Sequence, residues 1–219
     1  MGSIEAGAIV FDMDGLLVDS EPLWGQVEAD FARARGGDFT PELARQCVGQ
    51  GLANTLRVMN ATFGFPVDID RDSAEIVDRF VARAHELALK PGARELLEHA
   101  KGVVPVALGS SSSRRLVRAA LEAVGLSSRF IVVVTGDDVE HPKPAPDIFA
   151  RCARELRVVP GRCVVLEDSL AGVRAGRAAG MRVIAVPEGA PDGRGFEDHS
   201  DAVVGDLFEA WALLTLRPS

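Results

Sequence analysis

The fold of this chain is indicated by residues 8–15, AIVFDMDG, in which an unbroken apolar run leads directly into two aspartates. Apolar residues without polar alternation predict a strand that is covered on both faces, so the charges emerge at its carboxyl end. Residues two apart on an extended chain point the same way, so Asp12 and Asp14 can converge on one point. Two such carboxylates repel each other unless a cation or a proton separates them. The stretch therefore predicts an active site at a strand end, while a solvated Asp-rich turn is the plainer alternative.

The rest of the chain repeats this strand pattern beside helical patterns. Further short apolar runs occur at residues 106–108, 130–134, 163–166 and 183–186. Helices are predicted over residues 114–124, 146–156, 170–179 and 208–214. Pro105 is placed at the first residue of its strand, where a missing N–H matters least, and an edge strand is predicted at 201–204. This alternation is typical of α/β proteins, and we expect a Rossmann-like, doubly wound parallel sheet.

A long segment after the first strand has a different pattern. Residues 17–90 contain no comparable strand, and their apolar residues fall at helical spacing, as at Val27, Phe31 and Ala34. A connection of this length inside a compact sheet is improbable as a bare loop. We therefore expect an inserted α-helical cap domain over residues 18–90, and an α/β core domain formed by residues 1–17 and 91–219.

The composition excludes several classes of partner. The 24 Lys and Arg residues against 32 Asp and Glu residues give a net charge of −8, without a basic stripe for nucleic acid. No apolar stretch approaches the roughly 20 residues of a membrane span, and the first residues lack the layout of a secretory signal. The three cysteines show no paired spacing. We expect a cytoplasmic protein that acts on a small molecule, without nucleic-acid or membrane partners.

Polar residues follow the other predicted strands as well. A run of four serines, residues 110–113, follows the strand at 106–108, and hydroxyls with backbone N–H groups at a helix start form an anion site. Ser110 and Ser111 are the candidate phosphate-binding residues. Simple capping of the next helix is the alternative for this run.

A lysine and two more carboxylates complete the candidate site. Lys143 lies between prolines in the sequence HPKPAP, where the restricted backbone can hold one ammonium beside a phosphate. Glu167 and Asp168 follow the strand at 163–166. Oxygen ligands of this kind suit Mg²⁺, which is usually held by one or two carboxylates and substrate phosphate. In an open α/β sheet such residues meet at the carboxyl ends of the strands.

With these positions identified, the chain resembles the haloacid dehalogenase superfamily of phosphotransferases over nearly its whole length. The family's four motifs occur in order as DMDG at 12–15, Ser110, Lys143, and EDSLAG at 167–172. The stretch FDMDGLLVDSEPLW at 11–24 resembles the branch with a small helical cap, which includes sugar-phosphate and hexitol-phosphate phosphatases and β-phosphoglucomutase-like proteins.

The resemblance implies a role for each motif residue. Asp12 is the expected nucleophile that forms an aspartyl phosphate, and Asp14 is the expected general acid and base. Mg²⁺ is expected on Asp12, Asp168 and the Asp14 carbonyl, with Glu167 acting through water. Ser110, Ser111 and Lys143 are expected to bind the phosphoryl group. Relatives with this cap are often monomeric, so a monomer is expected.

The resemblance also suggests which residues face the substrate. On the cap side these are Glu21, Trp24, Gly49 and Gln50. The expected activity is hydrolysis of small phosphorylated metabolites, namely sugar or polyol phosphates. The alternative is phosphoryl transfer of the β-phosphoglucomutase type. Mutases of the family carry a histidine where this chain has Trp24, which cannot shuttle a proton and favours hydrolysis.

Two further alternatives are non-catalytic. Receiver domains also combine carboxylates, a hydroxyl and a lysine around Mg²⁺, but they run to roughly 120 residues without a helical insert. A degenerate family member acting as a regulator is disfavoured because every expected catalytic position is present.

Overall fold

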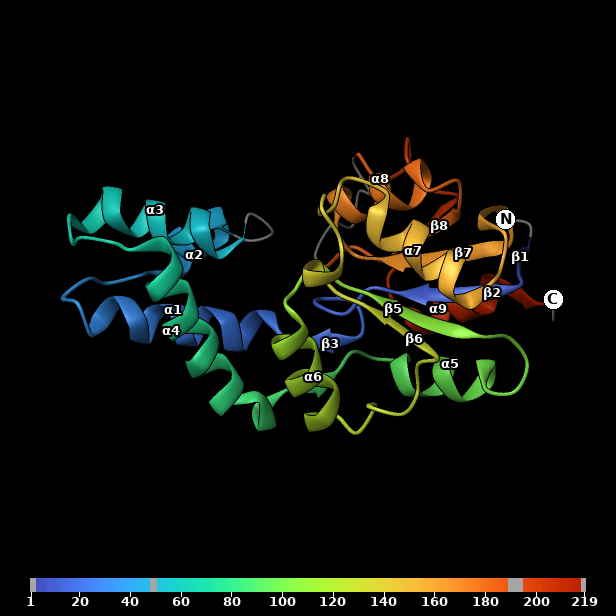
Figure 1. The fold of residues 1–219 in the computed structure, drawn as a ribbon, viewed down its shortest axis with the longest axis horizontal. Coiled ribbons are helices and arrows are strands. Elements are labelled where there is room, and N and C mark those ends of the chain that lie inside the picture. The colour runs from blue at the N-terminus through green and yellow to red at the C-terminus, as the bar shows by residue number, and fades with distance from the viewer. Residues whose placement is uncertain (1–2, 48–50, 189–194, 218–219) are drawn as a thin grey trace. The chain divides into compact units, whose positions relative to one another are not determined.

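The strands form a six-stranded parallel sheet in the order β6-β5-β2-β7-β8-β9 (Figure 1). The structure is a computed structural model that describes residues 3–47, 51–188 and 195–217. The strands of the sheet are β2 (Ala8–Phe11), β5 (Val106–Gly109), β6 (Val132–Val134), β7 (Cys163–Glu167), β8 (Arg182–Ala185) and β9 (Ala202–Val203). The predicted α/β class with a parallel sheet is confirmed. The order places β2 centrally, with its neighbours β5 and β7 on either side.

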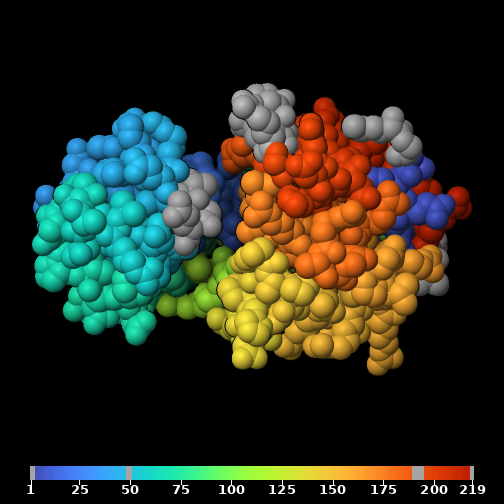
Figure 2. Space-filling model, turned by 90° about the horizontal axis from the view of Figure 1, so that it is seen from above, coloured from blue at the N-terminus to red at the C-terminus, as the bar shows by residue number. Residues whose placement is uncertain are grey.

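Helices cover both faces of this sheet. On one face α7 (Asp147–Leu156) and α8 (Leu170–Ala178) pack against each other, and Figure 2 shows their adjoining surfaces in light orange and orange. Side chains from this pair and from the central strands form a fully buried core that includes Val10, Phe149, Val165 and Val173. Figure 1 shows α5 (Ala93–Ala100) and α6 (Arg114–Ala123) on the opposite face, and α9 (Leu207–Leu213) packs on α5.

Several boundaries differ from those predicted. β6 begins at Val132 rather than at residue 130, because it is an edge strand and Ile131 is 72% exposed. β5 begins one residue after Pro105, whose carbonyl accepts a hydrogen bond from the N–H of Ile9. The predicted last helix ends at Leu213, and Leu214 begins a strand.

The two ends of the chain form a small sheet that the apolar pattern does not indicate. In it β1 (Ile4–Ala6) pairs in parallel with β10 (Leu214–Leu216). Three 3-10 helices complete the described structure: η1 (Ala84–Glu86), η2 (Gly136–Asp138) and η3 (Pro160–Arg162). None of the helices in the described ranges is long and apolar enough to cross a membrane.

The chain divides into two compact units, one formed by Met1–Asp19 with Ala88–Ser219 and the other by Ser20–Leu87. We call the second the helical unit. Its helices are α1 (Glu21–Arg33), α2 (Pro41–Cys47), α3 (Leu52–Phe63) and α4 (Ile69–Ala82). The chain leaves the sheet unit through β3 (Val18–Asp19) and returns through β4 (Ala88–Leu89), and these two strands pair antiparallel.

An arginine connects α1 to α4 within the helical unit. The guanidinium of Arg35 lies 3.6 Å from the centre of the Phe31 ring. Its Nη2 atom lies 2.7 Å from Glu75 and 3.4 Å from the fully buried Asp72. A planar cation that stacks on a ring and faces two carboxylates keeps this buried charge paired.

The interior of the helical unit also holds an unusual acid. Glu28 on α1 is only 8% exposed and forms a side-chain hydrogen bond with the buried Thr55 of α3. Burial raises the pKa of Glu28 to about 7, and the nearby Glu21 adds to the effect. A carboxyl in this setting favours its neutral form.

A glycine makes room for a carboxylate where β7 leads into α8. A Cβ atom on Gly172 would lie 1.6 Å from Oε1 of Glu167. The carboxylate of Glu167 turns back over the start of α8, where its Oε2 accepts hydrogen bonds from the N–H (2.6 Å) and hydroxyl (2.9 Å) of Ser169. The side chain of Glu167 can take this position only because residue 172 has no Cβ.

Replacing Gly172 by alanine is expected to destabilise the protein although alanine favours helices. The new methyl group displaces the Glu167 carboxylate, and such overpacking costs on the order of 1 to 3 kcal/mol. Gly25 on α1 is the matched control, because a Cβ there meets nothing within 4 Å. Gly25→Ala is expected to stabilise the protein by about 0.5 to 1 kcal/mol. Urea unfolding measures both, and equal stabilisation by the two substitutions would refute the packing of Glu167 on Gly172.

Glu28→Gln is expected to change how stability depends on pH. The pKa of Glu28 is higher in the folded protein than in the unfolded chain. The stability that protonated Glu28 contributes is therefore fully present below pH 4.5 and is lost as the pH rises through about 7. The variant should match the wild type near pH 4.5 and exceed it above pH 7 by on the order of 2 to 3 kcal/mol. Urea unfolding across pH 4.5–8.5 tests this, with the exposed Glu95→Gln on α5 as the control for losing one carboxylate. A constant difference across this range would contradict the buried acid.

Candidate active site

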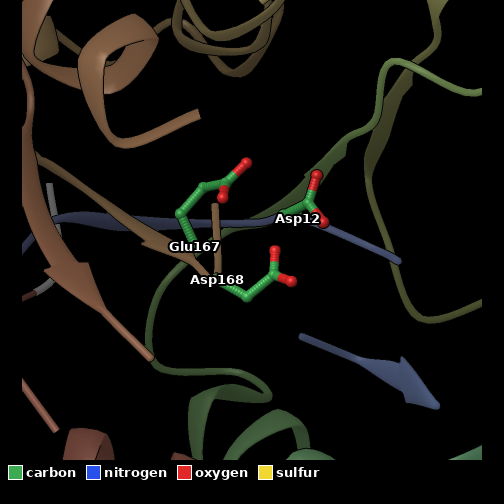
Figure 3. Close-up of side chains that lie close together, drawn as sticks. All are labelled: Asp12, Glu167 and Asp168. Carbon is green, nitrogen blue, oxygen red and sulfur yellow. The ribbon is translucent and has the colours of Figure 1, made fainter. Parts of the chain in front are cut away.

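Three carboxylates meet at the carboxyl ends of β2 and β7 (Figure 3). Asp12 directly follows β2, Glu167 ends β7, and Asp168 comes next in the chain. One oxygen from each lies within 4.8 Å of the other two. The parallel pairing of the strands produces this meeting, since Phe11 is opposite Leu166 and the N–H of Asp12 donates to the Leu166 carbonyl at 3.0 Å.

Lys143 reaches into this group from the loop after β6. Its Nζ donates to Oδ1 of Asp12 and, at 2.7 Å, to Oε1 of Glu167. The side chain is only 6% exposed, and its ammonium lies 4.5 Å from the centre of the Phe149 ring. The lysine therefore forms buried ion pairs with carboxylates from two different strands.

The ionisation of these groups is strongly perturbed. Burial raises the pKa of Asp12 to about 8, since the opposing effect of Lys143 is partly cancelled by the charges of Glu167 and Asp14. Burial also raises the pKa of Asp168 well above its usual range, and Glu167 and Asp12 add to the rise. Burial disfavours the Lys143 ammonium, but Asp12 and Glu167 raise its pKa overall. One lysine does not balance three clustered carboxylates, two of them buried, so the group favours a further cation.

The donor set fits Mg²⁺. It consists of carboxylate oxygens, and no imidazole or thiol is among the three clustered residues. Hard oxygen donors and a high local negative charge suit a small divalent ion better than they suit zinc. Asp12, Asp168 and Glu167 are the side chains of this chain that could hold it, directly or through water.

The serines follow β5, the strand that pairs with β2. Ser110 is buried, and its Oγ accepts a hydrogen bond from the Ser112 N–H at 3.0 Å. Because a hydroxyl both accepts and donates, Ser110 retains a proton that it can donate to an anion. Ser111 is exposed, and Ser113 caps α6 by accepting from the N–H of Leu116 at 3.5 Å. The run therefore contains a helix cap, and Ser110 directly follows β5.

Asp14 forms a contact that the sequence did not indicate. Its Oδ2 accepts a hydrogen bond from the hydroxyl of Ser112 at 2.8 Å. The next residue, Gly15, has a φ of +81°, and a Cβ there would lie 2.2 Å from Oδ2 of Asp168. The absence of a side chain at residue 15 thus lets the chain turn close to Asp168. A run of four serines carries no signal for which one meets Asp14.

The candidate substrate residues belong to the helical unit. Glu21 lies in the first turn of α1, and Trp24 follows one turn later. The Trp24 ring stacks on Phe80 of α4, with centroids 4.1 Å apart. Gly49 and Gln50 lie outside the described residues. Within the helical unit Trp24 is therefore part of the packing between α1 and α4.

Comparison with known proteins agrees with the motifs. The chain is 32% identical over 222 residues to the phosphorylated carbohydrates phosphatase of Thermotoga maritima, covering 96% of this chain and 94% of that protein. It is 31% identical to the bifunctional riboflavin kinase/FMN phosphatase of Arabidopsis thaliana, where the match covers 95% of this chain. This chain spans only 56% of the length of the Arabidopsis protein.

The structural comparison covers both units. CbbY from Rhodobacter sphaeroides, solved in complex with xylulose-(1,5)bisphosphate, superimposes with a TM-score of 0.82 at 30% identity. The match covers 93% of this chain and 96% of that one. The family model described as haloacid dehalogenase-like hydrolase matches residues 6–180. The chain thus belongs to the haloacid dehalogenase-like hydrolases.

Proposed function

We propose that this protein is a Mg²⁺-dependent phosphatase of small phosphorylated metabolites, namely sugar or polyol phosphates. The observation that carries the proposal is the buried group at the ends of β2 and β7, where three carboxylates face one lysine. Such a group suits a reaction in which a cation and an ammonium offset charge on a phosphoryl group. Family membership and the name of the Thermotoga relative support the same class of substrate.

In the proposed reaction Asp12 is the nucleophile. Its carboxylate attacks phosphorus, the bond from phosphorus to the substrate oxygen breaks, and an aspartyl phosphate forms. Lys143 lies beside Asp12 and can neutralise charge on the phosphoryl oxygens, while the buried Ser110 at the adjacent strand end donates to one of them. A bound Mg²⁺ would supply additional positive charge at the phosphoryl group.

Asp14 handles the proton in both halves of the proposed reaction. It donates a proton to the departing sugar oxygen, and it then takes a proton from the water that hydrolyses the aspartyl phosphate. The second half returns Asp12 to a carboxylate and releases inorganic phosphate. Asp14 is not one of the three clustered carboxylates and bonds to the hydroxyl of Ser112, which is consistent with this separate task.

Phosphoryl transfer of the mutase type is the alternative. It requires a base in the helical unit that can pass a proton between substrate hydroxyls. The residue at the matching position is Trp24, whose indole donates a hydrogen bond but cannot accept a proton. Its stacking on Phe80 further favours a packing role.

Phosphate release from a panel of substrates tests the proposal. The panel contains hexose and hexitol phosphates, β-glucose 1-phosphate, FMN and xylulose-(1,5)bisphosphate, each with and without Mg²⁺. We expect Mg²⁺-dependent release from sugar or polyol phosphates, reduced by about 10³-fold or more in Asp12→Asn and Asp14→Asn. Asp198→Asn, at an exposed position, is the control and should retain wild-type rates.

Three other outcomes would contradict parts of the proposal. Conversion of β-glucose 1-phosphate into glucose 6-phosphate without phosphate release would identify a mutase. Turnover of FMN alone, or of the bisphosphate alone, would overturn the substrate class. Full activity in Asp12→Asn would overturn the mechanism.

A further inference from the structure

The pairing of β2 with β5 brings Ser112 and Asp14 together. β2 and β5 are neighbours in which Phe11 pairs with Leu108. The chain continues three residues beyond Phe11 to Asp14, and four residues beyond Leu108 to Ser112. The two side chains therefore meet just above the paired strand ends, with Oγ and Oδ2 2.8 Å apart.

Hydrogen bonds of the Ser112 N–H and carbonyl fix the position of this residue. Its N–H donates to Oγ of Ser110, and its carbonyl accepts from the N–H of Gly136, each at 3.0 Å. Gly136 begins η2, and a Cβ atom on it would lie 2.3 Å from the carbonyl oxygen of Ser111. The loop after β6 thus packs closely on the serine run. A hydroxyl carried by this backbone loses little freedom when it bonds to Asp14.

The hydroxyl of Ser112 has no part in the helix cap or in the expected phosphate contacts. Ser113 caps α6, and Ser110 directly follows β5, the strand that pairs with β2. The hydrogen bond that Ser112 Oγ forms goes instead to Asp14. A helix-start role therefore does not account for the side chain at residue 112.

A hydroxyl is well suited to a partner that gains and loses a proton during turnover. It donates to a carboxylate, and after rotation about its C–O bond it accepts from a carboxylic acid. The contact with Asp14 can therefore persist through both halves of the reaction. A lysine in place of Ser112 could donate to the Asp14 carboxylate but could not accept a hydrogen bond from the protonated acid.

We propose that Ser112 is a positioning residue that fixes the orientation of the Asp14 carboxyl for proton transfer to and from the substrate oxygen. The inference rests on the proposed phosphatase function and adds a residue to it. A bond to one carboxyl oxygen fixes the rotation of the group, and small errors in the placement of a proton donor slow catalysis strongly.

The test compares two leaving groups in the first turnover, measured by rapid quench. One substrate is 4-nitrophenyl phosphate, whose phenolate departs without a proton, and the other is the best sugar or polyol phosphate of the panel. In Ser112→Ala we expect alcohol release from the sugar phosphate to slow roughly tenfold to hundredfold with unchanged KM. Nitrophenol release should slow by less than about threefold, because it needs no general acid.

Matched variants separate positioning from structure. Ser112→Thr keeps the hydroxyl and should restore the sugar phosphate rate. Ser112→Cys keeps the shape with a weak donor and should reproduce the alanine result, which provides a second test if alanine impairs folding. Ser113→Ala removes the cap of α6 and should lower the melting temperature without distinguishing the two substrates. Mg²⁺ affinity, measured by calorimetry, should be unchanged in Ser112→Ala.

The outcomes also distinguish this inference from the proposed function. Equal slowing of both substrates by Ser112→Ala, or no slowing of either, would overturn the positioning role while leaving the phosphatase intact. Absence of phosphate release by the wild-type protein from every substrate would instead overturn the proposed function.

Discussion

The mutual repulsion of three clustered carboxylates, two of them buried, is the constraint around which the sheet unit is organised. Asp12, Glu167 and Asp168 share one small region with a single lysine, and their environment favours protons or a further cation. Such a group destabilises a fold unless its charge is paired, because an isolated buried charge is costly. Lys143 pairs with part of this negative charge, and Glu167 also accepts a hydrogen bond from the N–H of Ser169. The remaining imbalance favours a further cation, which the proposed reaction would use.

The central position of β2 makes this arrangement possible. Its neighbours β5 and β7 run parallel to it, so the residues after each strand emerge at the same edge. β7 supplies the partners of Asp12, and β5 supplies the partner of Asp14. Asp12 and Asp14 thus have partners that come from different neighbouring strands.

Much of this could be predicted from sequence, because the signals are local. An apolar run that ends in Asp12, and a lysine confined by prolines, are visible without any knowledge of packing. The choice of Ser112 among four serines depends on the register between β2 and β5, which no single segment encodes. The need for glycine at residue 172 depends on the return of the Glu167 side chain over α8. The burial of Glu28 depends on contacts between helices, and a glutamate on an amphipathic helix gives no sign of it.

The pairing of β3 with β4 affects how the chain tolerates its long insertion. Val18 lies opposite Leu89, so the chain leaves and re-enters the sheet unit at adjacent points. For the sheet unit, residues 20–87 are equivalent to the tip of a hairpin, and the entropy of closing that loop grows only slowly with its length. Helices of different number or sequence can therefore occupy this place without changing the strand order. The insertion can therefore change during evolution while the residues at the strand ends of the sheet unit keep their arrangement.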